Sequence, residues 1–137
     1  MKKTYLKSLS AEFGLIFFTG AVLYYSIEVL WRGYSHISMA ILGGICFLLL
    51  YLMGRLFPKM PILLYSVLGG GIITLSELIT GEILNNALKL DIWDYSYVPL
   101  NYRGQICLLF SFFWCLLSYG AFYLSKLMRV KIFGFNS

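Results

Sequence analysis

Charge is scarce in this sequence, and that scarcity limits what the protein can be. Only 12% of its residues are charged, with six acidic residues and one histidine. A soluble domain carries roughly 25% charged residues, so polar surface is too limited here to cover a water-soluble fold. Although the formal net charge is +5, the basic residues lie in the ends and short connections. They form no basic face interleaved with aromatics, which excludes a nucleic-acid interface.

Metal-binding and nucleotide-binding signatures are also missing. The three cysteines, Cys46, Cys107 and Cys115, lie in apolar segments without C-x-x-C spacing or clustered histidines. This pattern indicates neither a zinc site nor a disulfide framework, so we expect no metal and no cofactor. No Walker A loop is present, so any ATPase associated with this protein would have to be a separate chain.

Long apolar runs take the place of charge. The sequence is 60% hydrophobic, its mean hydropathy is +0.79, and several runs reach the ~20 residues needed to cross a hydrocarbon core. We predict an all-α integral membrane protein that forms one domain over residues 1–137, a multi-pass protein of the cell membrane in contact with the lipid bilayer. Its four transmembrane helices are expected at about residues 12–32, 37–54, 62–85 and 104–127.

Glycines within these apolar runs predict where helices pack closely. Gly43 and Gly44 form a smooth patch in the second predicted helix, and Gly69, Gly70 and Gly71 follow one another in the third. Small residues allow the backbones of neighbouring membrane helices to approach each other. We therefore expect a close helix contact at each of these two places.

The basic residues also predict the orientation of the chain. Eight lie on the side of the two termini, and three, Arg32, Lys89 and Arg103, lie on the other side. Cytoplasmic segments carry the excess of lysine and arginine, so both termini should be cytoplasmic. The eight are Lys2, Lys3, Lys7, Arg55, Lys59, Lys126, Arg129 and Lys131.

Two groups of polar residues lie at the predicted outer helix ends. Glu28 and Arg32 are four apart on one helix face and can pair, either as an interfacial anchor or as part of a site. His36 starts the second helix, where a lone histidine is more often a cap or interfacial residue than a ligand. In the third helix, Glu77, Thr80 and Asn85 share one face. Ionisable groups inside membrane helices are functional candidates.

The connection over residues 86–103 is the longest in the chain, at 18 residues. Its aromatic residues, among them Trp93 and Tyr95, are typical of membrane interfaces and argue against disorder. Asp94 and Ser96 can form an Asx-type turn that folds the connection onto the helices, and they can equally belong to a binding site. We predict a long, aromatic-rich outer loop between the third and fourth helices.

These groups should meet near the outer leaflet. Glu77 lies about two turns inside its helix end, roughly 10 Å deep. A carboxylate at that depth needs a partner or a changed pKa, and we expect Arg32 or Arg103 as the partner. The hypothesis is one polar substrate-binding pocket formed by Glu28, Arg32, His36, Glu77, Thr80, Asn85, Trp93, Asp94, Tyr95, Ser96, Asn101, Arg103 and Gln105.

A family resemblance rests on residues from 28 to 118. Three elements follow in order: E-x-x-T-G over residues 77–81, W-D-Y-S over 93–96 and N-x-x-G-x-I-C over 101–107, with Ser111 and Trp114 after them. Together with Glu28, the run over residues 32–36 and Gly43-Gly44, these elements resemble the putative ABC-transporter type IV family, in its four-helix branch. The resemblance implies a permease-like bacterial membrane protein. Asn85 and Cys115 depart from the glutamate and glycine common in that family.

Three functions remain open at this point. A permease-like or transport-associated component fits the polar pocket, and with four helices it would need a homo-oligomer or a partner membrane or ATPase subunit. An outer-leaflet enzyme acting on lipids would use Glu77 or Asp94 as general base, with His36 or Arg103 orienting a phosphate. A structural or regulatory membrane subunit needs only that the polar groups pair with one another. No catalytic residue can be assigned from the sequence.

Overall fold

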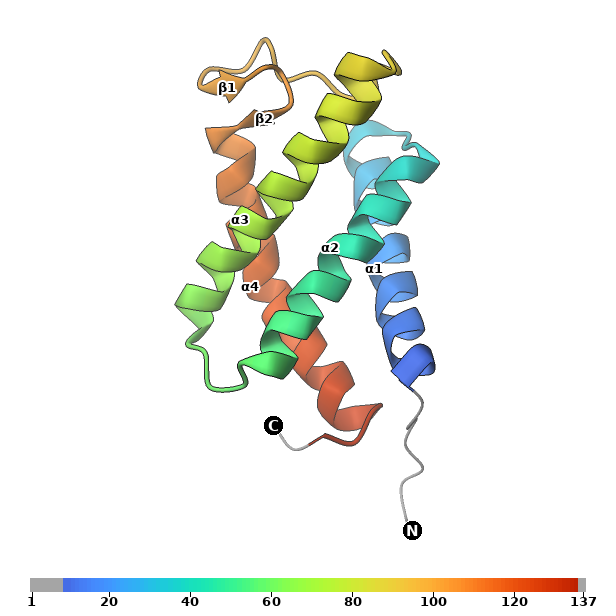
Figure 1. Cartoon of the computed structure of the whole chain (residues 1–137), viewed down its shortest axis with the longest axis vertical. Helices are drawn as coiled ribbons and strands as arrows, with labels where there is room; N and C mark the ends of the chain where they lie inside the picture. Colours follow the sequence, from blue (N-terminus) through green and yellow to red (C-terminus); the bar gives the residue numbers. More distant parts are fainter. Residues whose placement is uncertain (1–8, 136–137) are drawn as a thin grey trace.

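The computed structural model describes residues 9–135 and consists mainly of four long helices (Figure 1). Three connections join them, and the one between α3 and α4 contains a short π-helix, η1, and a two-stranded antiparallel hairpin. The elements are α1 (Leu9–Arg32), α2 (Ile37–Leu56), α3 (Ile62–Gly81), η1 (Glu82–Ala87), β1 (Asn101–Tyr102), β2 (Ile106–Cys107) and α4 (Leu108–Lys131).

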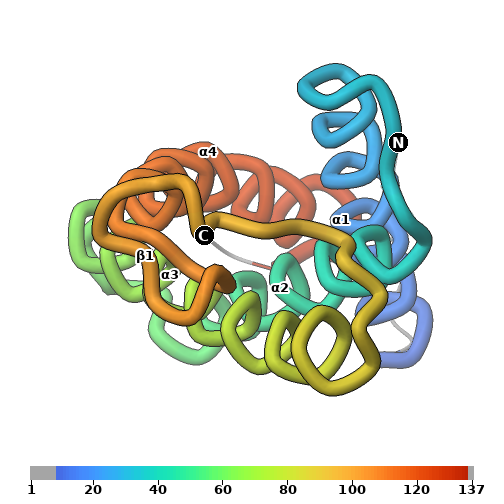
Figure 2. The backbone as a smooth tube through the Cα atoms, turned by 90° about the horizontal axis from the view of Figure 1, so that it is seen from above, coloured from blue at the N-terminus to red at the C-terminus, as the bar shows by residue number. Residues whose placement is uncertain are grey.

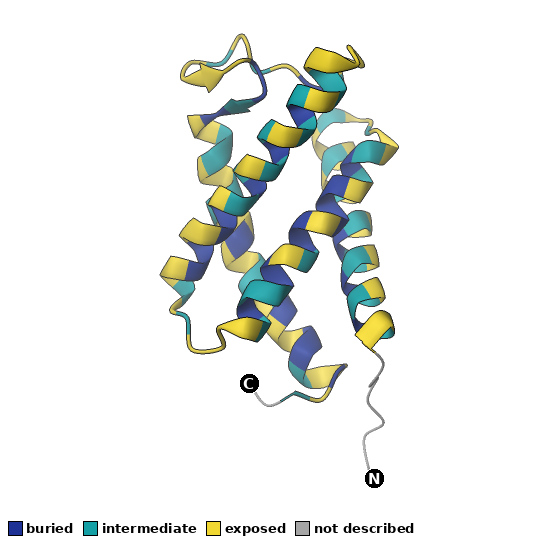
Figure 3. Ribbon diagram, in the orientation of Figure 1, coloured by how far each residue is buried: buried dark blue, intermediate teal, exposed yellow. Residues whose placement is uncertain are grey.

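Within the described part of the chain, four helical spans are long and apolar enough to cross a membrane, as the sequence predicts. The central helix is α2, because 56% of its most apolar stretch is buried, against 11% in α1 and in α4. Exposed residues run along the outer faces of the helices in Figure 3. Many of them are large apolar side chains such as Phe18, Leu63 and Phe112. Such faces suit hydrocarbon better than water.

Glycines allow close contact within two pairs of helices, as expected. The helices pack mainly in pairs, α1 on α2 and α3 on α4. A Cβ atom added to Gly43 would collide with Tyr24 of α1, and one added to Gly70 would collide with Cys115 of α4. Gly71, in contrast, has no neighbour for such an atom within 4 Å. Close backbone approach therefore holds each pair together, where dispersion replaces the hydrophobic effect.

The third and fourth helices differ from the predicted bounds of 62–85 and 104–127. The regular helix of α3 ends at Gly81 and continues as the wider π-helix η1, while α4 begins at Leu108. Residues 104–107 are not helical because Gly104 has φ of +73° and turns the chain into β2. A Cβ atom at Gly104 would lie 2.7 Å from side-chain oxygens of Asp94 and of Ser96, so the turn requires glycine.

The connection between α3 and α4 covers one end of the helix bundle. Figure 1 shows β1 and β2 at the end opposite the point where α1 begins and α4 ends. Seen along the bundle in Figure 2, the chain after η1 crosses from the side of α1 and α2 to α4. The Arg32 side chain of α1 donates a hydrogen bond to the carbonyl oxygen of Ile92, so this segment is tied to α1.

Candidate functional site

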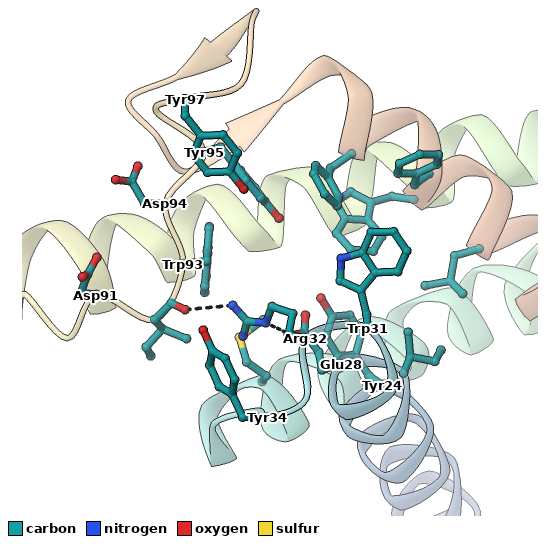
Figure 4. A pocket seen from close by; sticks show the side chains of 17 residues that line it. Tyr24, Glu28, Trp31, Arg32, Tyr34, Asp91, Trp93, Asp94, Tyr95 and Tyr97 are labelled. Carbon is teal, nitrogen blue, oxygen red and sulfur yellow. Dashed lines mark hydrogen bonds and ion pairs between the residues drawn. The ribbon is translucent and has the colours of Figure 1, made fainter.

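A cavity of about 580 Å³ lies at the loop-bearing end of the bundle, the end that the connection between α3 and α4 covers. The end of α1, residues 91–97 of the long connection and the first turns of α4 form its walls (Figure 4). More than half of the 17 lining residues are aromatic, and this volume lies within the usual range of a small-molecule site. The lining residues are Tyr24, Ile27, Glu28, Trp31, Arg32, Tyr34, Met39, Asp91, Ile92, Trp93, Asp94, Tyr95, Tyr97, Phe110, Phe113, Trp114 and Leu117.

An ion pair on the last turn of α1 forms one side of the cavity. Arg32 Nε lies 2.7 Å from Glu28 Oε2, which confirms the pairing expected from their spacing. Arg32 Nη1 also donates to the carbonyl oxygen of Ile92 at 3.2 Å, and the guanidinium carbon lies 4.9 Å from the ring centre of Tyr34. The pair is therefore both part of the cavity wall and a link between α1 and the long connection.

Glu77 lies directly behind the aromatic wall, and its partners differ from those expected. Its side chain is buried, with Oε1 accepting from the Tyr95 hydroxyl at 2.6 Å and Oε2 accepting from Trp114 Nε1 at 2.7 Å. The expected partners, Arg32 and Arg103, pair instead with Glu28 and with Glu82. The prediction was wrong because neutral N–H and O–H donors can satisfy a buried carboxylate as well as a cation can.

The two rings that bind Glu77 are also packed against a third. Tyr95 stacks on Phe110 with ring centres 4.9 Å apart and an interplanar angle of 14°, and Phe110 lies 6.1 Å from Trp114. Burial, followed by the nearby Glu77 carboxylate, raises the pKa of Tyr95 far above its usual range. Its hydroxyl therefore stays protonated and remains a donor to Glu77. Stacking and hydrogen bonding together fix the orientation of this wall.

Asp94 organises the loop by a local turn. Its Oδ1 accepts from the backbone N–H of Ser96 at 2.9 Å and from the Ser96 hydroxyl at 2.5 Å, which confirms the Asx-type turn. These two hydrogen bonds lower the pKa of Asp94, so its carboxylate is ionised at neutral pH. Asn101 closes the same loop by donating to the carbonyl oxygens of Val98 and Ser96.

Asn85 and Gln105 join the loop to η1 rather than line the cavity. Asn85 Nδ2 donates to Gln105 Oε1 at 2.8 Å, and Asn85 Oδ1 accepts from the Ile92 N–H at 2.7 Å. The backbone carbonyl oxygen of Gln105 accepts from Trp93 Nε1 at 3.0 Å. This network holds the Trp93 ring in place as part of the cavity wall.

Of the predicted pocket residues, the structure brings Glu28, Arg32, Trp93, Asp94 and Tyr95 to the cavity, with Glu77 behind them. The rest lie outside its lining, some of them in the loop networks described above. His36 caps α2 by accepting from the Ser38 N–H, one of the roles expected for it. Arg103 pairs with Glu82 at 2.7 Å, and Thr80 is half-buried on α3.

Sequence reasoning missed most of the aromatic lining. Tyr24, Glu28 and Trp31 follow at i, i+4 and i+7 on α1, and this spacing would have placed all three on one face. The pocket hypothesis included only two of the aromatic lining residues, Trp93 and Tyr95. All three tryptophans of the sequence, Trp31, Trp93 and Trp114, line the cavity.

A second polar cluster, also missed, lies at the opposite end of the bundle. Glu12 of α1 is buried and accepts a short hydrogen bond from the Tyr51 hydroxyl of α2. Arg55 Nη1 lies 3.5 Å from Glu12 Oε1, and Arg129 of α4 is buried nearby against Gly54. These residues take no part in the lining of the cavity above, and they join the ends of α1, α2 and α4.

The cavity offers both charged groups and aromatic rings to a ligand. It combines aromatic rings, one ion pair and two loop carboxylates, Asp91 and Asp94. In the part of the chain that the structure describes, no group of three His, Cys, Asp or Glu side chains is placed to hold a metal ion. Figure 4 shows Asp91 and Asp94 at one edge of the lining, and Trp31 and Glu28 rising from α1.

Comparison with known proteins places the chain in a family. No curated protein and no solved structure matches it. The model of one family, described as "Putative ABC-transporter type IV", matches residues 15–135, which include all four helices of the bundle almost completely and the whole cavity. The four apolar helices and this match together make the chain a multi-pass membrane protein that belongs to the ABC-transporter type IV family.

Proposed function

We propose that this protein is a permease-like membrane component of an ABC-type transport system and that it binds the transported ligand in the cavity at its loop-bearing end. One observation carries the proposal. A lining of charged and aromatic side chains is assembled from three separate segments, at one end of a bundle of apolar, membrane-length helices. Intramembrane and interfacial charges of this kind mark ligand sites more often than they support folding.

The cavity opens to the outside of the cell membrane in this proposal. Of the described basic residues, five lie at the end of α2, in the connection after it or in the last turns of α4, which is the end opposite the cavity: Arg55, Lys59, Lys126, Arg129 and Lys131. The count of basic residues that predicts the orientation also includes Lys2, Lys3 and Lys7, which lie outside the described residues. The positive-inside rule then makes the end away from the cavity cytoplasmic.

A partner completes the system. Four helices of 20–24 residues are few for a path across the membrane, and the sequence carries no Walker A loop. The energy source is therefore a separate ATPase subunit, which would bind at the cytoplasmic end, around the connection between α2 and α3. A second copy of the chain, or another membrane subunit, would supply the rest of the path.

A structural subunit is the second candidate, favoured by one specific observation. Both carboxylate oxygens of Glu77 are already occupied by Tyr95 and Trp114, so the charge expected to bind a solute serves the packing of α3 against α4. The lipid-processing enzyme has less support, since neither His36 nor Arg103 lines the cavity with Asp94.

Two loop tyrosines offer a matched test. Tyr97 lines the cavity and is 82% exposed, whereas Tyr102 is 57% exposed and does not line it. Neither substitution to alanine should disturb the fold, because both side chains are largely exposed. The tagged chain is isolated with its ATPase from native membranes, and both are placed in liposomes.

Ligand-dependent ATP hydrolysis is then measured with the wild type and with each variant. The proposal predicts that hydrolysis depends on the chain, that Tyr97→Ala weakens the response and that Tyr102→Ala leaves it unchanged. Equal responses from both variants would place the ligand elsewhere. Failure to isolate any ATPase, or hydrolysis independent of the chain, would favour the structural subunit.

A further inference from the structure

A second, apolar cavity of about 190 Å³ continues the first one along the bundle. The two cavities share Tyr24, Ile27 and Leu117 in their linings. The second is lined almost only by apolar atoms, and it lies between α1 and α4 with α2 behind it. Its lining is Gly20, Leu23, Tyr24, Ile27, Gly43, Cys46, Phe47, Leu50, Ile73, Leu117, Gly120, Ala121 and Leu124.

This second cavity opens sideways, toward the bilayer. It lies in a gap because α1 packs mainly on α2 while α4 packs mainly on α3, so that α1 and α4 barely touch. Leu23 is 44% exposed, Ile27 45% and Leu117 37%, although all three line the gap. Gly120 of α4 adds open space, because a Cβ atom there would meet nothing within 4 Å.

The length of the combined site matches one leaflet. Its lining on α1 runs from Gly20 to Arg32. Twelve helical steps at 1.5 Å per residue span roughly 18 Å. Half of a ~30 Å hydrocarbon core is about the same length. A molecule that fills both cavities would therefore have a polar group at the interface and an apolar chain reaching toward the middle of the bilayer.

The charged residues of the first, larger cavity indicate the sign of the charge on the ligand's polar group. Glu28 and Arg32 neutralise each other at 2.7 Å. Asp91 and Asp94 line the same cavity, and within residues 9–135 neither forms an ion pair, so the lining has an excess of negative charge. Aromatic rings line the cavity beside these two exposed carboxylates, and the combination of rings and carboxylates attracts organic ammonium groups.

We propose that the two cavities form one site for a membrane lipid whose headgroup carries an ammonium group. The headgroup lies among the aromatic rings near Asp91 and Asp94, and one acyl chain lies between α1 and α4. The lipid enters sideways from the bilayer through the gap at Gly120. This inference rests on the proposed function, because it names the ligand class of the same cavity.

The test uses the isolated chain, without any ATPase, in nanodiscs of equimolar phosphatidylethanolamine and phosphatidylglycerol. The lipid that stays bound after mild extraction is counted by native mass spectrometry. We expect one phosphatidylethanolamine per chain, enriched over phosphatidylglycerol. Retention of both lipids in the proportion of the bilayer would overturn the headgroup assignment.

Matched variants test each half of the site. Gly120→Leu fills the gap and should abolish retention, whereas Gly71→Leu should not, although a Cβ atom there also meets no neighbour within 4 Å. Asp91→Asn combined with Asp94→Asn should lower the enrichment about fivefold. Asparagine tolerates the positive φ of residue 91 and retains the turn at residue 94. Glu82→Gln removes a carboxylate outside the cavity and should have no effect.

Tryptophan emission separates a bilayer lipid from a free organic cation. In phosphatidylglycerol nanodiscs, phosphatidylethanolamine should shift the emission of the three cavity tryptophans, while added tetramethylammonium, which has no tail, should not. A shift in tryptophan emission caused by tetramethylammonium alone would overturn the assignment of a lipid as the ligand. If the chain forms a dimer and Gly120→Leu dissociates it, a second copy of the chain occupies the gap between α1 and α4. That result would also overturn the assignment of a lipid. Lipid retention without chain-dependent ATP hydrolysis would contradict only the proposed function.

Discussion

Trp114 of α4 donates its indole N–H to Glu77 of α3 at 2.7 Å, and the same carboxylate accepts from Tyr95 of the long connection. One buried acid thus joins two helices and the loop that closes the cavity. Two of the rings in the cavity wall are held by this acid, so its removal should affect stability and binding together.

Glu77→Gln tests this arrangement. Glutamine offers one acceptor oxygen and a donor NH₂ group, so either Tyr95 or Trp114 loses its partner. A buried donor left without an acceptor costs about 1–3 kcal/mol, and we expect a loss of that size in the free energy of unfolding. Unfolding in mixed detergent–SDS micelles measures it, with Glu82→Gln as control because Glu82 is only partly buried. Equal losses in both variants would contradict a special role for residue 77.

The Asp94 turn predicts a pH dependence of the loop. Its hydrogen bonds to Ser96 lower the pKa of Asp94 in the folded protein. The stabilisation is therefore complete above the unfolded value of about 3.9 and is lost as the pH falls through the lower folded value. Exchange of the Ser96 amide hydrogen should accelerate over that acidic window. In Asp94→Asn, which keeps the turn without a titrating group, the acceleration should be absent. An identical pH response in both proteins would refute the assignment.

The α3–α4 contact predicts a pair of opposite glycine effects. Gly70→Ala places a methyl group against Cys115, including its backbone atoms at 3.0 Å, and should lower the free energy of unfolding by about 1–3 kcal/mol. Combining it with Cys115→Gly should restore part of the loss. Gly71→Ala meets no neighbour and should leave stability unchanged or slightly raise it. Unfolding in mixed micelles measures the stability of each variant. A loss of stability in Gly71→Ala as large as that in Gly70→Ala would contradict the packing described for α3 and α4.

The cluster at the opposite end predicts coupling between Glu12 and Tyr51. Both side chains are buried and share a hydrogen bond, so Tyr51→Phe and Glu12→Ala each remove a partner of the other. A double-mutant cycle should give an interaction free energy of at least about 0.5 kcal/mol. Glu12 and Ser66 share no contact given by the structure and serve as the control pair. The effects of their substitutions on the free energy of unfolding should be additive. Additive behaviour of Glu12 and Tyr51 would show that their hydrogen bond contributes nothing.

Local patterns were enough to predict several features of this protein. The four membrane helices follow from the length and apolar content of the runs, because a bilayer demands both. The pairing of Glu28 with Arg32, the cap at His36 and the Asx turn at Asp94 each involve residues two to four apart. Helix and turn geometry alone brings such residues together.

The partners of Glu77 and the aromatic lining were decided only by the tertiary structure. Tyr95 and Trp114 lie 18 and 37 residues from Glu77 in the chain, and Tyr51 lies 39 from Glu12. Those contacts depend on which helices pack together and on where the long connection crosses, and no local spacing encodes either. The sequence by itself determined that this is a membrane protein with acids near its helix ends. The packing of the helices determined that rings enclose some of those acids in a cavity and that the cavity continues into the gap between α1 and α4.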